Sequence, residues 1–285
     1  MRPHLEVFSY ILKHNSDKLV CDMDKDETIN LRAFVEHLLI TFLIMGVCWG
    51  LCIVLSVFGI TIKNCFWLYI PWFIGGISPA IASFIVLKKN RIVNGFIDWI
   101  KHVFDFKHKI WSYLIAIIFP IIQVLMMCLI SGYKLGLQLY WLPLMILAMV
   151  FAGGLEEAGW RYITYPFLRK KCGFILAALI VTIIWWVWHM PLFFIPETSQ
   201  YHKDFLVFGI MVLGMSFMLA AIREITGSVW LCILCHAIIN SAGNFFHYDM
   251  YGSYLASSIT TASLIIISII IVLIYHRNNK KQNQC

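Results

Sequence analysis

Residues 139–168 read LYWLPLMILAMVFAGGLEEAGWRYITYPFL, a composition typical of a helix that crosses a membrane. The stretch exceeds the roughly 20 apolar residues that span a hydrocarbon core of about 30 Å. It nevertheless carries three ionisable side chains near its middle, Glu156, Glu157 and Arg161. Such groups cost about 2.5–3.5 kcal/mol each at the centre of a membrane helix, so they mark a functional site by default. We expect the rest of the chain to house these charges and to supply their partners.

The whole chain has the composition of a polytopic membrane protein. It has 285 residues, of which 61% are hydrophobic and 13% charged, with a mean hydropathy of +0.81. Ordinary soluble domains are far less apolar. We therefore expect an all-α polytopic membrane protein, with about eight transmembrane helices forming a bundle around a membrane-embedded polar cavity. The eight apolar runs cover residues 33–60, 65–87, 110–131, 139–168, 172–195, 204–222, 228–247 and 254–275.

The chain divides into one membrane domain and two short polar ends. Residues 1–32 are expected to form a cytoplasmic N-terminal segment, and residues 277–285 a short cytoplasmic tail. The single membrane domain covers residues 33–276, and its functional core lies in the fourth to seventh helices, residues 139–247. Residues 91–109 place apolar side chains at helical spacing among lysines and histidines, which is typical of an amphipathic helix at the membrane interface.

The distribution of Lys and Arg predicts the orientation in the membrane. If the N-terminus is cytoplasmic, 18 of these residues fall in inside segments and 3, namely Lys63, Lys134 and Lys203, in outside loops. Cytoplasmic segments carry an excess of Lys and Arg, so both termini are expected to be cytoplasmic. We expect an integral, multi-pass protein, in the cell membrane if the organism is prokaryotic. The net charge of +7 forms no stripe with interleaved aromatic residues, so no nucleic-acid partner is expected.

Few other strongly polar side chains lie deep in the apolar runs. The best candidates are His189 in the fifth helix, and His236 and Asn240 in the seventh. With about 1.5 Å of rise per residue, they lie about 15–24 Å from the cytoplasmic helix ends, at the level of Glu156. A polar group alone in hydrocarbon is unsatisfied, so we expect these four side chains to meet.

Helix geometry separates the two glutamates. Glu157 and Arg161 lie about 40° apart around the helix, whereas Glu156 lies about 140° from Arg161. We expect Glu157 to pair with Arg161, which leaves Glu156 unneutralised in the environment of a general base. His236 and Asn240 are four residues apart and present one face, so both can donate hydrogen bonds to a developing oxyanion.

Three motifs in this region resemble the signatures of a known family. Together, in this order and over about 100 residues, they look like those of the CAAX prenyl endopeptidase and bacteriocin-processing (CPBP) family of intramembrane proteases, also called the Abi family. Trp185 departs from the pattern, in which Phe is usual. The motifs are Glu156-Glu157-x-x-x-Arg161, Trp185-x-x-x-His189 and His236-x-x-x-Asn240.

The resemblance implies an intramembrane endopeptidase that hydrolyses a peptide bond with glutamate- and histidine-activated water. Its substrate would be a hydrophobic or lipidated peptide or protein, met among membrane lipids. Bacterial relatives are associated with peptide processing, immunity or regulation, so the resemblance leaves the substrate open. The implied catalytic residues are Glu156 and His189, which activate water, and His236 and Asn240, which stabilise the tetrahedral intermediate, with Glu157, Arg161 and Trp185 in support.

The candidate residues also leave a metal site open. Glu156, His189 and His236 could hold zinc through nitrogen and oxygen ligands. The paired-histidine motif of many zinc peptidases, His-Glu-x-x-His, does not occur in the sequence. We therefore prefer a mechanism that uses no cofactor.

A non-enzymatic function is the alternative. Buried carboxylates and histidines also serve in proton relays, so the same polar cavity could belong to a transporter, an immunity protein or a scaffold. The two halves of the sequence show no convincing repeat of the kind found in transporters. The enzymatic reading is therefore preferred.

Overall fold

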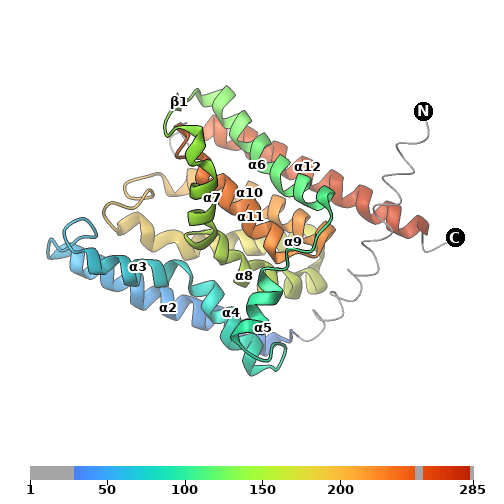
Figure 1. Ribbon diagram of the computed structural model, residues 1–285, viewed down its shortest axis with the longest axis horizontal. Helices are drawn as coiled ribbons and strands as arrows, with labels where there is room; N and C mark the ends of the chain where they lie inside the picture. Colours follow the sequence, from blue (N-terminus) through green and yellow to red (C-terminus); the bar gives the residue numbers. More distant parts are fainter. Residues whose placement is uncertain (1–28, 248–252, 283–285) are drawn as a thin grey trace.

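The computed structural model describes residues 29–247 and 253–282, and nearly all of this part of the chain is helical (Figure 1). Two short strands, β1 (Lys134–Leu135) and β2 (Phe246–His247), pair antiparallel. The helices are α2 (Leu31–Val57), α3 (Tyr69–Gly76), α4 (Ser78–Lys89), α5 (Phe96–Val103), α6 (Ile110–Ser131), α7 (Leu142–Phe151), α8 (Glu157–Gly159), α9 (Tyr165–His189), α10 (Phe205–Thr226), α11 (Val229–Ala242) and α12 (Tyr254–Gln282). Shorter helical turns are η2 (Phe66–Leu68), η3 (Leu139–Trp141), η4 (Gly154–Glu156), η5 (Trp160–Thr164) and η6 (Met190–Phe194).

The described residues contain five helices that are long and apolar enough to cross a membrane, and six if α3 and α4 count as one span bent by 51°. Helix α11 is apolar but shorter. The expected all-α membrane fold is confirmed, whereas the expected number of eight spans is not. The five are Leu31–Val57, Ile110–Ser131, Leu139–Phe194, Phe205–Thr226 and Tyr254–Asn279.

The longest of these spans covers both the fourth and the fifth expected helix. Gly173 interrupts it, with φ 81° and ψ 175°. Glycine adopts a positive φ without the steric cost that a Cβ atom imposes. The interruption lies next to residue 172, where the sequence predicted the fifth helix to begin.

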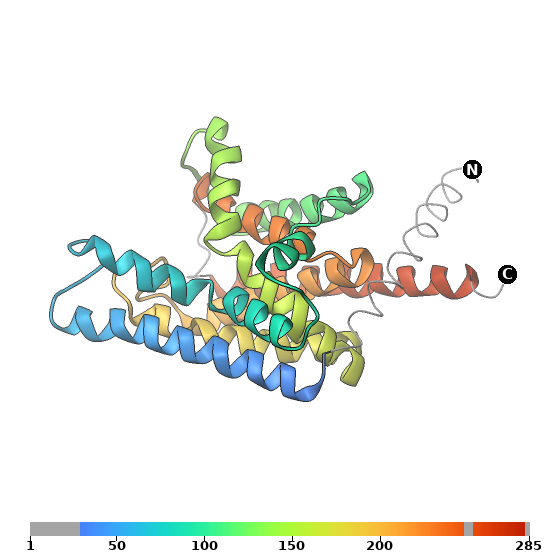
Figure 2. The ribbon, with the colours of Figure 1, turned by 60° about the horizontal axis from the view of Figure 1, so that its bottom comes forward.

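Helices α10 and α11 occupy the middle of the bundle. The apolar window of α10 is 67% buried, the highest share among the spans, and α10 packs against α9, α11 and α12. Helix α11 packs against α6 and α7. Figures 1 and 2 show α2, α3 and α4 along one side of this centre, and α6 and α12 along the other. Polar groups on α8, α9 and α11 therefore meet away from the lipid-facing surface.

Close packing around Gly159 fixes the segment that carries the two glutamates. A Cβ atom on Gly159 would lie 2.6 Å from Pro79 Cβ and 2.8 Å from His37 Nε2. The buried His37 ring lies 3.3 Å from the Pro79 carbonyl oxygen and 3.3 Å from the Thr164 hydroxyl. Helices α2, α4 and α8 thus approach one another through a glycine, and His37 is a structural histidine with its polar atoms satisfied.

The segment expected as an amphipathic helix over residues 91–109 is helical over a shorter stretch, Phe96–Val103. Trp99 and Val103 are buried, and Trp99 donates from Nε1 to the Ser83 hydroxyl at 3.0 Å. Phe96 and Ile97 are exposed. The helix therefore has one face packed on the bundle and one open face that includes apolar residues, and its place at the membrane interface stays a prediction.

Candidate active site

Glu157 lies at the centre of a buried row of three side chains. Its Oε2 accepts a hydrogen bond from Arg161 Nε at 2.9 Å, and its Oε1 lies 2.9 Å from His236 Nδ1. The Glu157 and Arg161 side chains are completely buried. The predicted pairing of these two residues is confirmed. The same carboxylate also fixes the His236 imidazole, because its second oxygen accepts a hydrogen bond from His236 Nδ1.

Glu156 faces two residues of α9 instead. Its Oε2 accepts from Trp185 Nε1 at 2.7 Å and lies 3.9 Å from His189 Nε2. His189 Nδ1 lies 2.8 Å from the Trp185 carbonyl oxygen. A carbonyl oxygen only accepts, so Nδ1 carries the proton and Nε2 turns its lone pair toward Glu156. A separation of 3.9 Å is too long for a direct hydrogen bond and suits a bridging water.

Asn240 lies one turn beyond His236 on α11, opposite a break in the backbone. Helix α7 ends at Phe151, and Gly153 follows with an extended φ of 177°. A Cβ atom on Gly153 would collide with Asn240 Nδ2 and would lie 3.6 Å from His236 Nε2. Glycine at this position therefore leaves space beside both nitrogen atoms.

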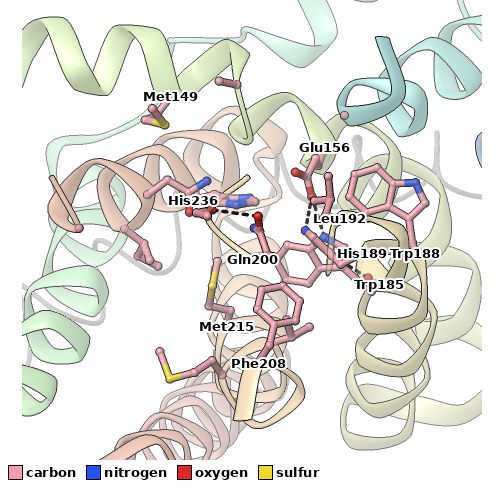
Figure 3. Close-up of a pocket in the computed structure, with 18 of the residues that line it drawn as sticks. Met149, Glu156, Trp185, Trp188, His189, Leu192, Gln200, Phe208, Met215 and His236 are labelled. Atoms are coloured by element: carbon pink, nitrogen blue, oxygen red, sulfur yellow. Dashed lines mark hydrogen bonds and ion pairs between the residues drawn. The ribbon is translucent and has the colours of Figure 1, made fainter. Parts of the chain in front are cut away.

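One cavity of about 580 Å³ is lined by Glu156, His189, His236 and Asn240, the four residues expected to converge. In Figure 3, Glu156 and His189 lie on one side of it and His236 on the other. The cavity is of the size that takes organic ligands, with a mostly apolar wall and a few polar groups. Its apolar lining includes Trp49, Trp72, Phe73, Met149, Phe151, Trp188, Leu192, Phe208, Met211, Val212 and Met215.

Arg161 stands behind this cavity and does not line it. Its guanidinium lies 5.8 Å from the Trp185 ring centre and 6.0 Å from that of Tyr165, and its Nη2 lies 3.5 Å from the Ser216 hydroxyl. A buried arginine of this kind is held by its carboxylate partner and by aromatic faces. Arg161 therefore acts on the cavity through Glu157, because it fixes the carboxylate that is hydrogen-bonded to His236.

The zinc ligands considered from the sequence do not form a cluster. The described residues contain no group of three or more His, Cys, Asp or Glu side chains that could hold a metal ion. His236 turns Nδ1 to Glu157, while Glu156 and His189 lie 3.9 Å apart on the other side of the cavity. Glu156, His189 and His236 thus do not fit a zinc site in this arrangement, and no step below uses a metal.

Two features of the cavity were not anticipated from the sequence. The sequence indicated Gly153 only as a residue close to Glu156 and Glu157. In the structure it lies between α7 and η4 and leaves space beside the Asn240 side chain. Lys203 was counted only for topology, yet it lines the cavity with Gln200. The Gly153-Gly154 pair inside an apolar run could have indicated the role of Gly153. No pattern in the sequence indicates that Lys203 lines the cavity.

Comparison with known proteins identifies relatives of this region. Residues 138–242 match the model of a family described as type II CAAX prenyl endopeptidase, Rce1-like. The chain is also 24% identical over 176 residues to CAAX prenyl protease 2 of Methanococcus maripaludis, in an alignment that covers 56% of this chain and 62% of the relative. The chain thus spans less than two thirds of the length of that relative. The family match over residues 138–242 contains all three motifs, and this part of the chain is therefore similar to the CAAX-type prenyl endopeptidases.

Proposed function

We propose that the protein is an intramembrane endopeptidase that hydrolyses a peptide bond in a hydrophobic or lipidated peptide with activated water. The observation that carries the proposal is the arrangement across one cavity. Glu156 and His189 face each other at 3.9 Å, and His236 and Asn240 line the same cavity opposite them. The first pair suits water activation, and the second supplies donors for a negatively charged oxygen.

In the first step, water held between Glu156 and His189 Nε2 loses a proton to Glu156. The water oxygen then attacks the carbonyl carbon of the substrate peptide bond. His189 orients the water through its Nε2 lone pair, since its Nδ1 is engaged with the Trp185 carbonyl oxygen. Trp185 holds the Glu156 carboxylate in place from Nε1 at 2.7 Å.

The tetrahedral intermediate carries its negative charge on the former carbonyl oxygen. In the proposed mechanism His236 donates to this oxygen from Nε2 and Asn240 from Nδ2. Glu157 accepts a hydrogen bond from His236 Nδ1 at 2.9 Å, and this carboxylate favours an imidazole with protons on both nitrogen atoms. One such donor typically contributes a factor of about 10² to 10³ in rate.

Collapse of the intermediate breaks the C–N bond. The proton taken up by Glu156 passes to the departing nitrogen, so the products are one peptide with a new carboxyl end and one with a new amino end. No proton or electron from outside the substrate and water is required. The same glutamate therefore serves first as base and then as acid.

The test is peptide cleavage by the purified protein in detergent, followed by mass spectrometry of apolar peptides with and without a lipid chain. We expect new peptide ends from the wild type, and their loss in Glu156→Ala and in His189→Ala at unchanged melting temperature. Asn240→Ala should lose about 10²- to 10³-fold in rate, as for one oxyanion donor. Near-normal turnover by Glu156→Ala would refute the mechanism.

Metal dependence is tested in the same assay. We expect cleavage to persist in a strong chelator and the purified protein to hold no stoichiometric metal. One zinc per chain that restores a chelated enzyme would overturn the metal-free mechanism. A transporter or scaffold with the same cavity would release no new peptide ends in any of these experiments.

A further inference from the structure

One end of the bundle gathers nearly all of its cationic side chains. Glu36, near the start of α2, pairs with Lys89 at the end of α4 at 2.8 Å. Glu224, at the end of α10, pairs with Arg169 at 2.6 Å and with His276 of α12 at 2.8 Å. We call this the basic end, and 12 Lys and Arg residues whose side chains the structure describes belong to it: Arg32, Lys88, Lys89, Arg91, Lys101, Lys107, Lys109, Arg169, Lys170, Lys171, Arg223 and Arg277.

Separate contacts define the opposite end. Glu197, after η6, accepts from the Thr61 hydroxyl at 3.0 Å and from the Lys63 backbone, so the loop before α10 lies against the loop after α2. Asp204 accepts from the Tyr254 hydroxyl at 2.6 Å, and β1 pairs with β2. Among the described residues, the Lys and Arg side chains at this end are Lys63, Lys134 and Lys203.

The cavity reaches this second end and not the basic one. Ser199, Gln200 and Lys203 from the loop before α10 line it, together with Asn244 and His247 after α11. None of the cations of the basic end is among its lining residues. In Figure 3, Gln200 projects into the space between His236 and His189. The cavity therefore has its polar rim at the end that holds few cations.

Cytoplasmic ends of membrane bundles carry the excess of Lys and Arg. Among the described side chains, 12 Lys and Arg residues lie at the basic end and 3 at the rim end. We infer that the cavity opens on the side of the membrane opposite the cytoplasm, so that its substrate is an apolar peptide segment presented from that outer side. The statement about the substrate rests on the proposed function, whereas the orientation of the cavity does not depend on it.

The walls of the cavity agree with an apolar occupant that arrives from the lipid or the outer surface. Phe73 of α3 and Phe151 of α7 line the cavity and are 38% and 47% exposed, so apolar wall continues to the surface of the bundle between these helices. An exported peptide or the outer end of a membrane-spanning segment has the required chemistry, since such segments are apolar and reach the outer interface. A cytoplasmic protein would approach the bundle at the basic end, and none of the cations of that end lines the cavity.

The test is cysteine labelling in bacterial cells that express the protein in their plasma membrane. Ser199→Cys places a thiol at the exposed rim, and Lys171→Cys places one at the exposed basic end. Cys65 is replaced by Ser in both, because it lies near the rim end, and the signal of this parent is subtracted. Labelling in detergent verifies that each new thiol reacts in the folded protein.

With a membrane-impermeant maleimide, we expect Ser199→Cys to react in intact cells and Lys171→Cys to react only after permeabilisation. Labelling of Lys171→Cys in intact cells, or a requirement for permeabilisation at Ser199→Cys, would overturn the inference. Neither result depends on catalysis. Loss of peptide cleavage on Glu156→Ala is read separately, so failure of the orientation and failure of the enzyme are distinguishable.

Discussion

Glu156 and Glu157 are neighbours in the chain and have different partners in the structure. Glu157 binds Arg161 and His236 at 2.9 Å each, whereas Glu156 binds Trp185 at 2.7 Å and faces His189. Helix geometry alone predicted the Glu157–Arg161 pair, because four residues bring two side chains onto one face. The partners on α9 and α11 are contacts between helices, and no periodicity within one helix reports which atoms meet across such a contact.

Trp185→Phe tests the hydrogen bond that holds Glu156. The substitution keeps an aromatic ring and removes the Nε1 donor, so the carboxylate loses a contact of 2.7 Å. A hydrogen bond to a charged group contributes about 1.5–3 kcal/mol, which corresponds to about 10- to 150-fold in rate. We expect kcat to fall within this range while KM changes little.

The matched control for this change is Trp186→Phe, which removes a donor that bonds the Phe205 carbonyl oxygen at 2.9 Å. It should leave kcat nearly unchanged. Equal kcat losses in both variants would show that Trp185 contributes packing alone.

Gly153→Ala tests the space beside the donors. The new Cβ atom would collide with Asn240 Nδ2, so the amide must move from its place near His236. A displacement of about 1 Å in a reacting site can cost about 10²-fold in rate. We expect a loss of that order in peptide cleavage, with a melting temperature close to that of wild type.

The control is Gly50→Ala in α2, where a Cβ atom would meet no atom within 4 Å. It should retain full activity, since helical Ala is at least as favourable as Gly. Normal cleavage by Gly153→Ala would show that Asn240 is not one of the donors that stabilise the oxyanion.

At the scale of the elements, the helix break before Glu156 sets the site. Helix α7 ends at Phe151, and the chain then passes through η4, α8 and a turn of π-helix, η5, before α9 begins. The sequence predicted one continuous helix over residues 139–168, because apolar residues flank the short stretch from Gly153 to Arg161 on both sides. Single-turn π-helices are typical of functional sites, and their wider turn cannot be derived from the hydrophobic period.

Arg161→Met tests how far the buried ion pair holds α8, η5 and α11 together. The change leaves the Glu157 carboxylate buried without its cation, and removal of one partner of a buried pair costs about 3–5 kcal/mol. We expect a large fall in the melting temperature measured in detergent.

Arg32→Met is the comparison, because the Arg32–Glu36 pair is exposed, with 79% of the arginine side chain accessible. Exposed pairs contribute about 0–1 kcal/mol, so its melting temperature should stay near that of wild type. A similar fall in both variants would contradict a special role for the buried pair.

At the scale of the whole molecule, composition predicted the all-α membrane fold, whereas the orientation that the charge pattern predicts stays a prediction. The ring of Phe34, near the start of α2, stacks on that of Phe167, near the start of α9, at 4.5 Å, so Arg32 and Arg169 lie at one end of the bundle although they are distant in sequence. The number of spans was less predictable, since Gly173 and the bend between α3 and α4 break apolar runs without changing their composition. The cavity itself follows from the packing of α3, α7, α9, α10 and α11, which the sequence does not encode in any single pattern.

The most direct test of the central claim is the rate of peptide-bond cleavage by purified Glu156→Gln. This change keeps the shape of the side chain and removes its capacity to take a proton from water. We expect both peptide fragments to disappear from the mass spectrum while the melting temperature stays within a few degrees of wild type. The control Glu36→Gln, which alters an exposed pair at the basic end, should cleave at the wild-type rate. Wild-type fragment release by Glu156→Gln would contradict the account.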